Sequence, residues 1–157
     1  MDWTLFAIFF AASIAAASTG ALFEPGAWYK GLDKPRWTPP NWLFPVVWTV
    51  LYIAMAVAAA RIAVTDAAPM AMAFYTLQLV LNTLWTPVFF GLRRLGGGML
   101  VISGLWLAVA ATTVTFWQID TVAGLLLAPY LLWASIAGAL NFSVWRRNPG
   151  AGGKPAQ

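Results

Sequence analysis

Three apolar segments of this 157-residue chain each place a tryptophan at helical spacing from a polar or small side chain. The three sets are Trp48 with Tyr52, Gln78 and Asn82 with Trp85, and Trp133 with Ala137 and Asn141. Residues three or four positions apart share one face of an α-helix, so each segment would present an indole beside an amide, a phenol or a small residue. If these faces converge, they form an apolar pocket with a few orienting polar groups, as small-molecule sites usually do. The alternative is that the same side chains only pack against or bridge neighbouring helices.

The ionisable residues argue against several kinds of chemistry. All five acidic residues fall in loops or at segment ends, and Arg61 lies about one turn from the end of its segment. No charge relay can be drawn through the apolar segments, which argues against an ion-coupled transporter and against catalysis by paired carboxylates. The chain has no histidine and no cysteine, so we expect neither a metal site nor a bound cofactor. The nine basic residues form no stripe, so nucleic acid is not an expected partner.

The elements that must position the tryptophans are membrane helices. Hydrophobic residues make up 61% of the chain and charged residues 9%, whereas soluble domains carry about a quarter charged residues. No segment shows the alternation of a membrane β-barrel, and the apolar runs are long enough to cross a bilayer as helices. We therefore predict an all-α integral membrane bundle of five transmembrane helices, antiparallel where the links are short. The predicted helices are residues 3–23, 42–64, 70–90, 97–117 and 122–145.

The connection at residues 24–41 is much longer than the others. It carries Trp28, Tyr29 and Trp37, and disordered segments seldom keep such residues. We expect it to be an ordered lid over one end of the bundle. Where it enters the second helix, the stretch WTPPNWLFPVVW should have extended backbone before its paired prolines, Asn41 as the helix N-cap, and Pro45 in the first turn.

The two ends of the chain raise separate questions. Residues 11–18, AASIAAAS, imitate the cleavage site of a secretory signal, but no Lys or Arg precedes them, so we keep this segment as a helix. The first helix and the other four form a domain that extends to residue 146. Residues 147–157 are expected to be a solvated tail.

The basic residues predict the orientation. With five crossings, every Lys and Arg except Arg61 falls on the side of the long loop and the C-terminus. The positive-inside rule then places the N-terminus outside and the long loop and C-terminus in the cytoplasm. This bias favours the cytoplasmic membrane of a bacterium, with an outer membrane left open.

Three long motifs carry a family resemblance. They are WTPPNWLFPVVWTVLY (37–52), LQLVLNTLWTPVFFGLRR (77–94) and APYLLWASIAGALNFSVWR (128–146). In order and spacing they resemble the TspO/MBR family of tryptophan-rich sensory proteins and translocator proteins, also called peripheral benzodiazepine receptors. The chain looks like a bacterial member of this family, similar to those of photosynthetic α-proteobacteria. The resemblance implies five transmembrane helices, a homodimer, and a pocket beneath the first long loop that binds porphyrins such as protoporphyrin IX, sterols and benzodiazepine-type drugs.

The resemblance also implies which residues bind the ligand. Carried over by motif, they are Trp28, Trp37, Pro40, Phe44, Trp48, Tyr52, Asn82, Trp133 and Ala137. Lys34 or Arg36 would meet porphyrin propionates at the mouth. Metal-free porphyrin is expected, since histidine and cysteine ligands for haem iron are lacking. The sterol motif of mammalian relatives has a tyrosine where this chain has Phe142, so cholesterol binding by that route is not expected.

Three functions remain open at this stage. The first is a membrane receptor or translocator that senses, sequesters or moves tetrapyrroles. The alternative is an enzyme that degrades porphyrin with light and oxygen, in which Trp48 and Trp133 would be the catalytic residues, because they match tryptophans proposed for that role in some bacterial relatives. The third is a regulatory partner of another membrane protein, with the pocket as its effector site.

Overall fold

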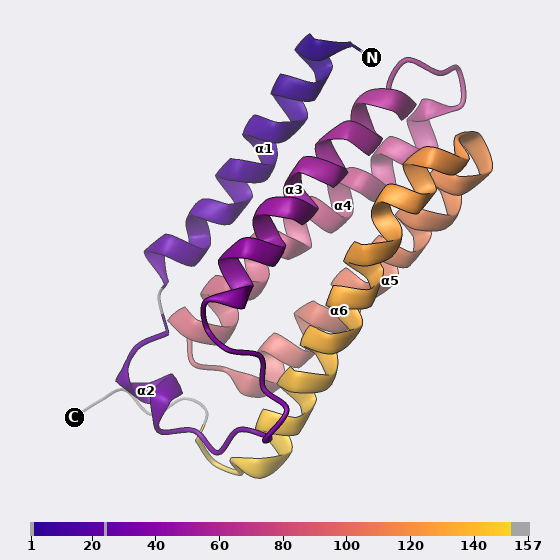
Figure 1. Ribbon diagram of the computed structural model, residues 1–157. Coiled ribbons are helices and arrows are strands. Elements are labelled where there is room, and N and C mark those ends of the chain that lie inside the picture. Colours follow the sequence, from indigo (N-terminus) through magenta and orange to yellow (C-terminus); the bar gives the residue numbers. More distant parts are fainter. Residues whose placement is uncertain (1, 24, 152–157) are drawn as a thin grey trace.

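The computed structural model describes residues 2–23 and 25–151, and it is a bundle of long helices (Figure 1). The described elements are α1 (Trp3–Leu22), α2 (Ala27–Lys30), α3 (Leu43–Ile62), α4 (Ala68–Thr86), the π-helix η1 (Pro87–Gly91), α5 (Leu95–Ile119) and α6 (Thr121–Arg147). The predicted all-α class is confirmed for these residues. Helix α5 extends two residues beyond the predicted segment at each end. Helix α6 extends one residue beyond the predicted segment at its start and two at its end.

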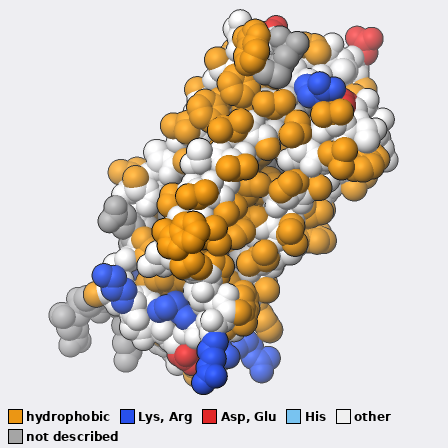
Figure 2. All heavy atoms as spheres, viewed as in Figure 1, with side chains coloured by type: hydrophobic (Ala, Val, Ile, Leu, Met, Phe, Trp, Pro, Cys, Tyr) orange, Lys and Arg blue, Asp and Glu red, His pale blue; other side chains and the backbone are white. Residues whose placement is uncertain are grey.

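Four helices, α1, α3, α5 and α6, are long and apolar enough to cross a membrane. Helix α4 is outside this set because Gln78 and Asn82 lower its mean hydropathy. On the face seen in Figure 2, hydrophobic side chains cover the flank of the bundle, and Lys and Arg gather at the end that carries α2. An apolar flank with charges confined to the ends is typical of a protein that lies in lipid.

Aspartates begin the first and last long helices. Asp2 accepts hydrogen bonds from the backbone N–H groups of Thr4 and Leu5, at 2.9 and 3.1 Å. Asp120 accepts from Val122 and Ala123 in the same way. These carboxylates accept hydrogen bonds from N–H groups that have no partner within the helix. The negative charge of each carboxylate also interacts favourably with the positive end of the helix dipole.

The start of α3 differs from the prediction. Asn41 is not the N-cap; the helix begins at Leu43, after Trp42, and no side chain caps it. The backbone N–H of Leu43 instead donates to the carbonyl of Pro40 at 3.0 Å, so the turn winds directly into the helix. Pro45 lies in the first helical turn as predicted, where its missing N–H leaves no bond unmade.

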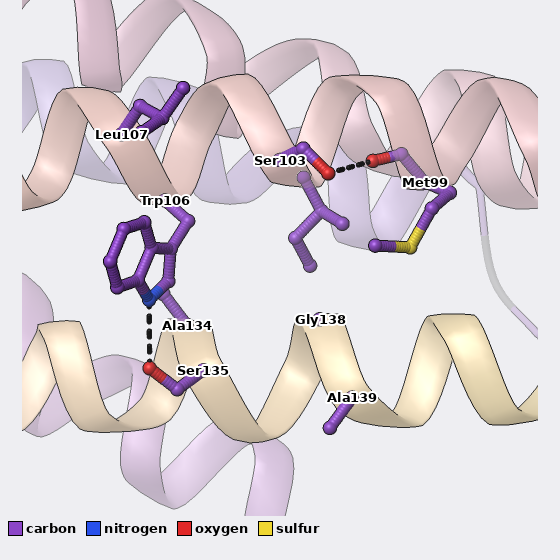
Figure 3. Close-up of a pocket in the computed structure, with 9 residues that line it drawn as sticks. Met99, Ser103, Trp106, Leu107, Ala134, Ser135, Gly138 and Ala139 are labelled. Carbon is purple, nitrogen blue, oxygen red and sulfur yellow. Dashed lines mark hydrogen bonds between the residues drawn. The ribbon is translucent and has the colours of Figure 1, made fainter.

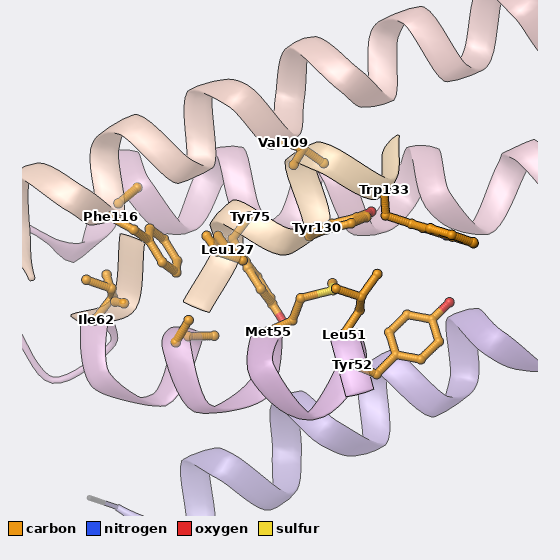
Figure 4. Close-up of a cluster of buried hydrophobic side chains, with 14 of the residues drawn as sticks. Leu51, Tyr52, Met55, Ile62, Tyr75, Val109, Phe116, Leu127, Tyr130 and Trp133 are labelled. Atoms are coloured by element: carbon orange, nitrogen blue, oxygen red, sulfur yellow. The ribbon is translucent and has the colours of Figure 1, made fainter. Parts of the chain in front are cut away.

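The larger cluster of buried hydrophobic side chains lies mainly toward the end of the bundle away from α2, and a smaller cluster lies beside the lid. The larger cluster is built from α3, α4, α5 and α6, with Met55, Ile62, Tyr75, Phe116 and Leu127 almost fully buried (Figure 4). A run of buried alanines on α3 lets the neighbouring helices approach closely.

Candidate ligand-binding cavity

A cavity of about 690 Å³ occupies the half of the bundle nearest α2. Its walls come from all five long helices and from η1, and its volume falls in the usual range for small-molecule sites, roughly 300–1,000 Å³. Six of the nine residues predicted to bind ligand line it: Phe44, Trp48, Tyr52, Asn82, Trp133 and Ala137. Trp85 and Asn141 also line it, so the three helical faces singled out by residue spacing meet around one space.

Aromatic rings form much of the wall. Trp48 stacks on Tyr52 with ring centroids 5.3 Å apart and meets Tyr130 edge-on at 5.9 Å. Phe44 meets Trp133 edge-on at 5.5 Å. Among the described residues, neither Trp48 nor Trp133 donates its indole N–H to a protein acceptor. These two indoles therefore offer flat apolar faces together with free donors.

A chain of hydrogen bonds lies at the inner end of the cavity. Tyr52 donates to Asn82 Oδ1 at 3.2 Å, Asn82 Nδ2 donates to the Tyr130 hydroxyl at 2.9 Å, and that hydroxyl donates to Gln78 Oε1 at 3.0 Å. The bonds join α3, α4 and α6, and the hydroxyl protons of Tyr52 and Tyr130 are both donated to amide oxygens. Tyr130 was missed in the sequence, although it lies three residues before Trp133 and so shares its face.

Asn141 joins three elements beside the cavity. Its Oδ1 accepts from the indole of Trp85 at 3.3 Å, and its Nδ2 donates to the carbonyl of Leu95 at 3.2 Å. Helix α5 comes this close because Gly98 has no side chain: a Cβ there would lie 2.8 Å from Phe89 and 3.0 Å from Asn141 Oδ1. The sequence placed Asn141 on one helical face with Trp133, but it did not predict the hydrogen bonds of Asn141 to Trp85 and Leu95.

The π-helix η1 turns two phenylalanines toward the cavity. The N–H of Leu92 donates to Pro87 at 2.8 Å, five residues back, and the wider turn brings Phe89 and Phe90 into the lining. Phe89 stacks on Trp85 with centroids 5.1 Å apart. A π-turn inside a helix often marks a functional site. No sequence pattern predicted it, because it depends on how the end of α4 packs.

The predicted lid residues behave differently from the wall residues. Trp28, Trp37 and Pro40 do not line the cavity; Trp28 is half-buried against Phe89, and Trp37 is 51% exposed. Tyr29 lines the cavity instead, because the short helix α2 turns the residue after Trp28 inward. Burial raises the pKa of the Tyr29 hydroxyl, so it stays protonated at neutral pH.

The ammonium group of Lys34 is hydrogen-bonded to backbone carbonyls of the lid itself. Its Nζ donates to the carbonyls of Tyr29 at 2.8 Å, Leu32 at 3.0 Å and Lys30 at 3.3 Å, and it lies 4.8 Å from the centre of the Tyr29 ring. These bonds close the C-terminal end of α2, where unpaired carbonyls favour a cation. The expectation that Lys34 meets ligand carboxylates is thus not supported by its contacts, whereas Arg36 is exposed.

A second, open groove of about 420 Å³ lies on the outer surface between α5 and α6 (Figure 3). Trp106 crosses it and donates its indole N–H to Ser135 at 2.8 Å. Trp106 is 39% exposed and lies outside the cavity that Trp48 and Trp133 line. This tryptophan therefore belongs to the outer surface of the bundle.

The apolar flank, the helical bundle and the internal cavity define an integral membrane protein with a candidate site for a small hydrophobic molecule. The chain belongs to the TspO/MBR family, whose model matches residues 4–146. This confirms the resemblance carried by the three motifs.

Three relatives illustrate the match. The chain is 56% identical to "Protein CrtK" of Rhodobacter capsulatus, over 96% of each chain. It is 52% identical to the "Tryptophan-rich sensory protein" of Cereibacter sphaeroides, over 94% of each chain. It is 42% identical to the human "Translocator protein", over 78% of this chain and 76% of the human one.

Proposed function

We propose that this protein is a membrane receptor or translocator that binds porphyrins, protoporphyrin IX in particular, in the cavity. Other flat hydrophobic molecules, such as sterols or benzodiazepine-type drugs, would bind in the same space. The observation that carries the proposal is the pair of indoles, Trp48 and Trp133, on the wall of one apolar cavity. The role would be tetrapyrrole sensing, sequestration or transport, in keeping with the sensory and translocator names of two relatives.

The physical basis is burial of a flat ring system against aromatic faces. Stacking on indole and phenol rings adds to the gain from removing apolar surface from water. None of the described residues that line the cavity carries a charge at neutral pH. Ligand carboxylates would therefore stay at the mouth, where Arg36 is exposed, because an unpaired carboxylate is costly in an apolar interior.

The same proposal includes the arrangement in the membrane. We infer that α4 together with η1, which run without a break from Ala68 to Gly91, forms a fifth crossing. The lid and the C-terminus would then face the cytoplasm, since all the basic residues that the structure describes except Arg61 lie at that end. A bacterial membrane is the expected location, the cytoplasmic membrane in particular. A homodimer is the expected assembly.

Titration of purified protein with protoporphyrin IX tests the proposal. We expect saturable quenching of tryptophan fluorescence and a shifted porphyrin absorption band, both weakened in Trp48→Ala. Trp106→Phe is the matched control, because that indole lies in the outer groove. Absence of saturable binding to the unaltered protein would overturn the proposal, as would equal binding by Trp48→Ala.

The ring contacts also support the enzyme alternative as a second candidate. Trp48 touches both Tyr52 and Tyr130, so an oxidised indole would have phenols within reach. Illumination of the porphyrin complex in air tests this: a catalytic role predicts a new product spectrum that Trp48→Phe and Trp133→Phe both abolish. A product that forms equally in both variants would assign the photochemistry to the porphyrin alone.

A further inference from the structure

We propose that Asn148 latches the lid over the cavity and so controls how fast a ligand enters and leaves, an inference that rests on the proposed function. The lid is residues 25–41, and the latch is the set of contacts that Arg147, Asn148 and Ala151 make with it. The segment after α6 was expected to be a solvated tail. In its described part, the side chains of Arg147 and Asn148 and the backbone carbonyl of Ala151 contact the lid.

Asn148 grips the lid with a reciprocal pair of hydrogen bonds. Its Oδ1 accepts from the backbone N–H of Asp33 at 2.9 Å, and its Nδ2 donates to the carbonyl of Asp33 at 2.9 Å. The same Nδ2 donates to the Val144 carbonyl at 2.7 Å, near the end of α6. One amide side chain thus satisfies the backbone of the lid and the end of the helix together, which requires both a donor and an acceptor.

Two further contacts surround this pair. The indole of Trp28 donates to the carbonyl of Ala151 at 3.1 Å, so the latch holds the lid within α2 as well as just after it, at Asp33. The Arg147 guanidinium lies 3.5 Å from the Asp33 carboxylate, but both side chains are exposed, and such ion pairs add little. The hydrogen bonds of Asn148 and Trp28 therefore carry most of the polar attachment.

The latch is coupled to the cavity through the underside of the lid. Leu32, next to Asp33, is 8% exposed and packs in a cluster with Phe89, Leu95, Leu140 and Val144. Tyr29, next to Trp28, lines the cavity itself. Leu32 adjoins the backbone that Asn148 holds, and Tyr29 adjoins the residue whose indole Ala151 holds, so opening of the latch frees both side chains to move. The latch residues themselves do not line the cavity.

This geometry predicts an effect on rates more than on affinity. If the closed lid blocks entry and exit alike, weakening the latch raises the association and dissociation rates together. Loss of two hydrogen bonds should raise both rates about tenfold, with a dissociation constant changed by less than about threefold. A defect in the binding surface would instead raise the dissociation rate alone.

The test uses the full-length protein with Asn148→Ala and Asn148→Asp. The aspartate keeps the acceptor, but it removes the donor and sets a carboxylate against two carbonyls. Trp28→Phe is a second variant that removes the N–H and keeps the ring packed on Phe89. Arg146→Gln is the matched control, since Arg146 lies over the Phe142 ring at the same helix end. Circular dichroism verifies that every variant keeps its helical content.

The first measurement is amide hydrogen exchange without ligand. We expect faster exchange at Asp33 and through residues 27–34 in both Asn148 variants, and unchanged exchange in Arg146→Gln. Unchanged exchange in the Asn148 variants would overturn the latch. This measurement needs no ligand, so it tests whether Asn148 holds the lid even if the proposed function is wrong.

The second measurement is stopped-flow binding of protoporphyrin IX. Parallel increases in both rate constants support control of access by the latch. Faster lid exchange with unchanged rate constants would overturn that control and leave the proposed function standing. Failure of the unaltered protein to bind protoporphyrin IX would instead count against the proposed function alone.

Discussion

The Nε atom of Arg61 lies 2.6 Å from Oδ2 of Asp120, and this contact closes the end of the bundle opposite the lid. It joins the C-terminal turn of α3 to the link between α5 and α6. Asp120 also caps α6 by accepting from two backbone N–H groups. A single carboxylate therefore serves an ion pair between helices and the start of the last helix.

This pair predicts a pH-dependent stability. The hydrogen bond from Arg61, followed by those from the backbone, holds the pKa of the Asp120 carboxyl below its ordinary value of 3.8. A depressed pKa contributes stability above the unfolded-state value, and that stability is lost as the pH falls through the folded value. Asp120→Asn keeps a good cap but loses the ion pair, so it should melt at a lower temperature at pH 7. Thermal unfolding in detergent should show the difference in melting temperature between the two proteins shrinking below about pH 4. A difference in melting temperature that does not depend on pH would contradict this role of Asp120.

Gly98 should tolerate no side chain. Gly98→Val would force atoms against Phe89 and Asn141, and we expect a loss of about 1–3 kcal/mol of stability. Gly138→Ala is the matched control on α6, because a Cβ there meets nothing within 4 Å. The control should be neutral or more stable by up to about 1 kcal/mol, since alanine favours helix over glycine. Equal melting temperatures for the two variants would show that the close approach of α5 is not required.

The hydrogen-bond chain predicts unequal effects for two tyrosines. Tyr130→Phe removes an acceptor for Asn82 and a donor to Gln78, and Gln78 is 1% exposed, so two buried partners are left unpaired. Tyr52→Phe removes only a terminal donor. We expect Tyr130→Phe to cost about 1–2 kcal/mol and Tyr52→Phe about half as much, measured by unfolding in detergent. The reverse order would contradict the assigned donors.

The flat faces of the cavity predict a graded response to aromatic replacement. Trp133→Phe keeps a ring against Phe44, whereas Trp133→Ala leaves a space. We expect protoporphyrin IX affinity to fall a few-fold in the first variant and about tenfold or more in the second. Equal losses would indicate that the indole N–H, and not the stacking face, is what the ligand uses.

The sequence by itself determined the helices and the faces that meet around the cavity. Helical periodicity is local, so Trp48 with Tyr52, and Trp133 with Ala137 and Asn141, could be placed on common faces without knowledge of the neighbours. Apolar composition and length likewise indicated helices long enough for a bilayer, and the structure has such helices in α1, α3, α5 and α6. The start of α3 was misplaced because a backbone turn replaced the expected side-chain cap.

Only the tertiary structure decided which side chains meet. The partners of Asn82 on α3 and α6, the inward turn of Tyr29 in place of Trp28, and the π-turn at Phe89 all follow from how the helices pack. The Asn148 bonds to Asp33 join residues 115 positions apart, and local spacing carries no signal for such a contact. Each of these features depends on the distance between elements, which the periodicity of a single helix does not contain.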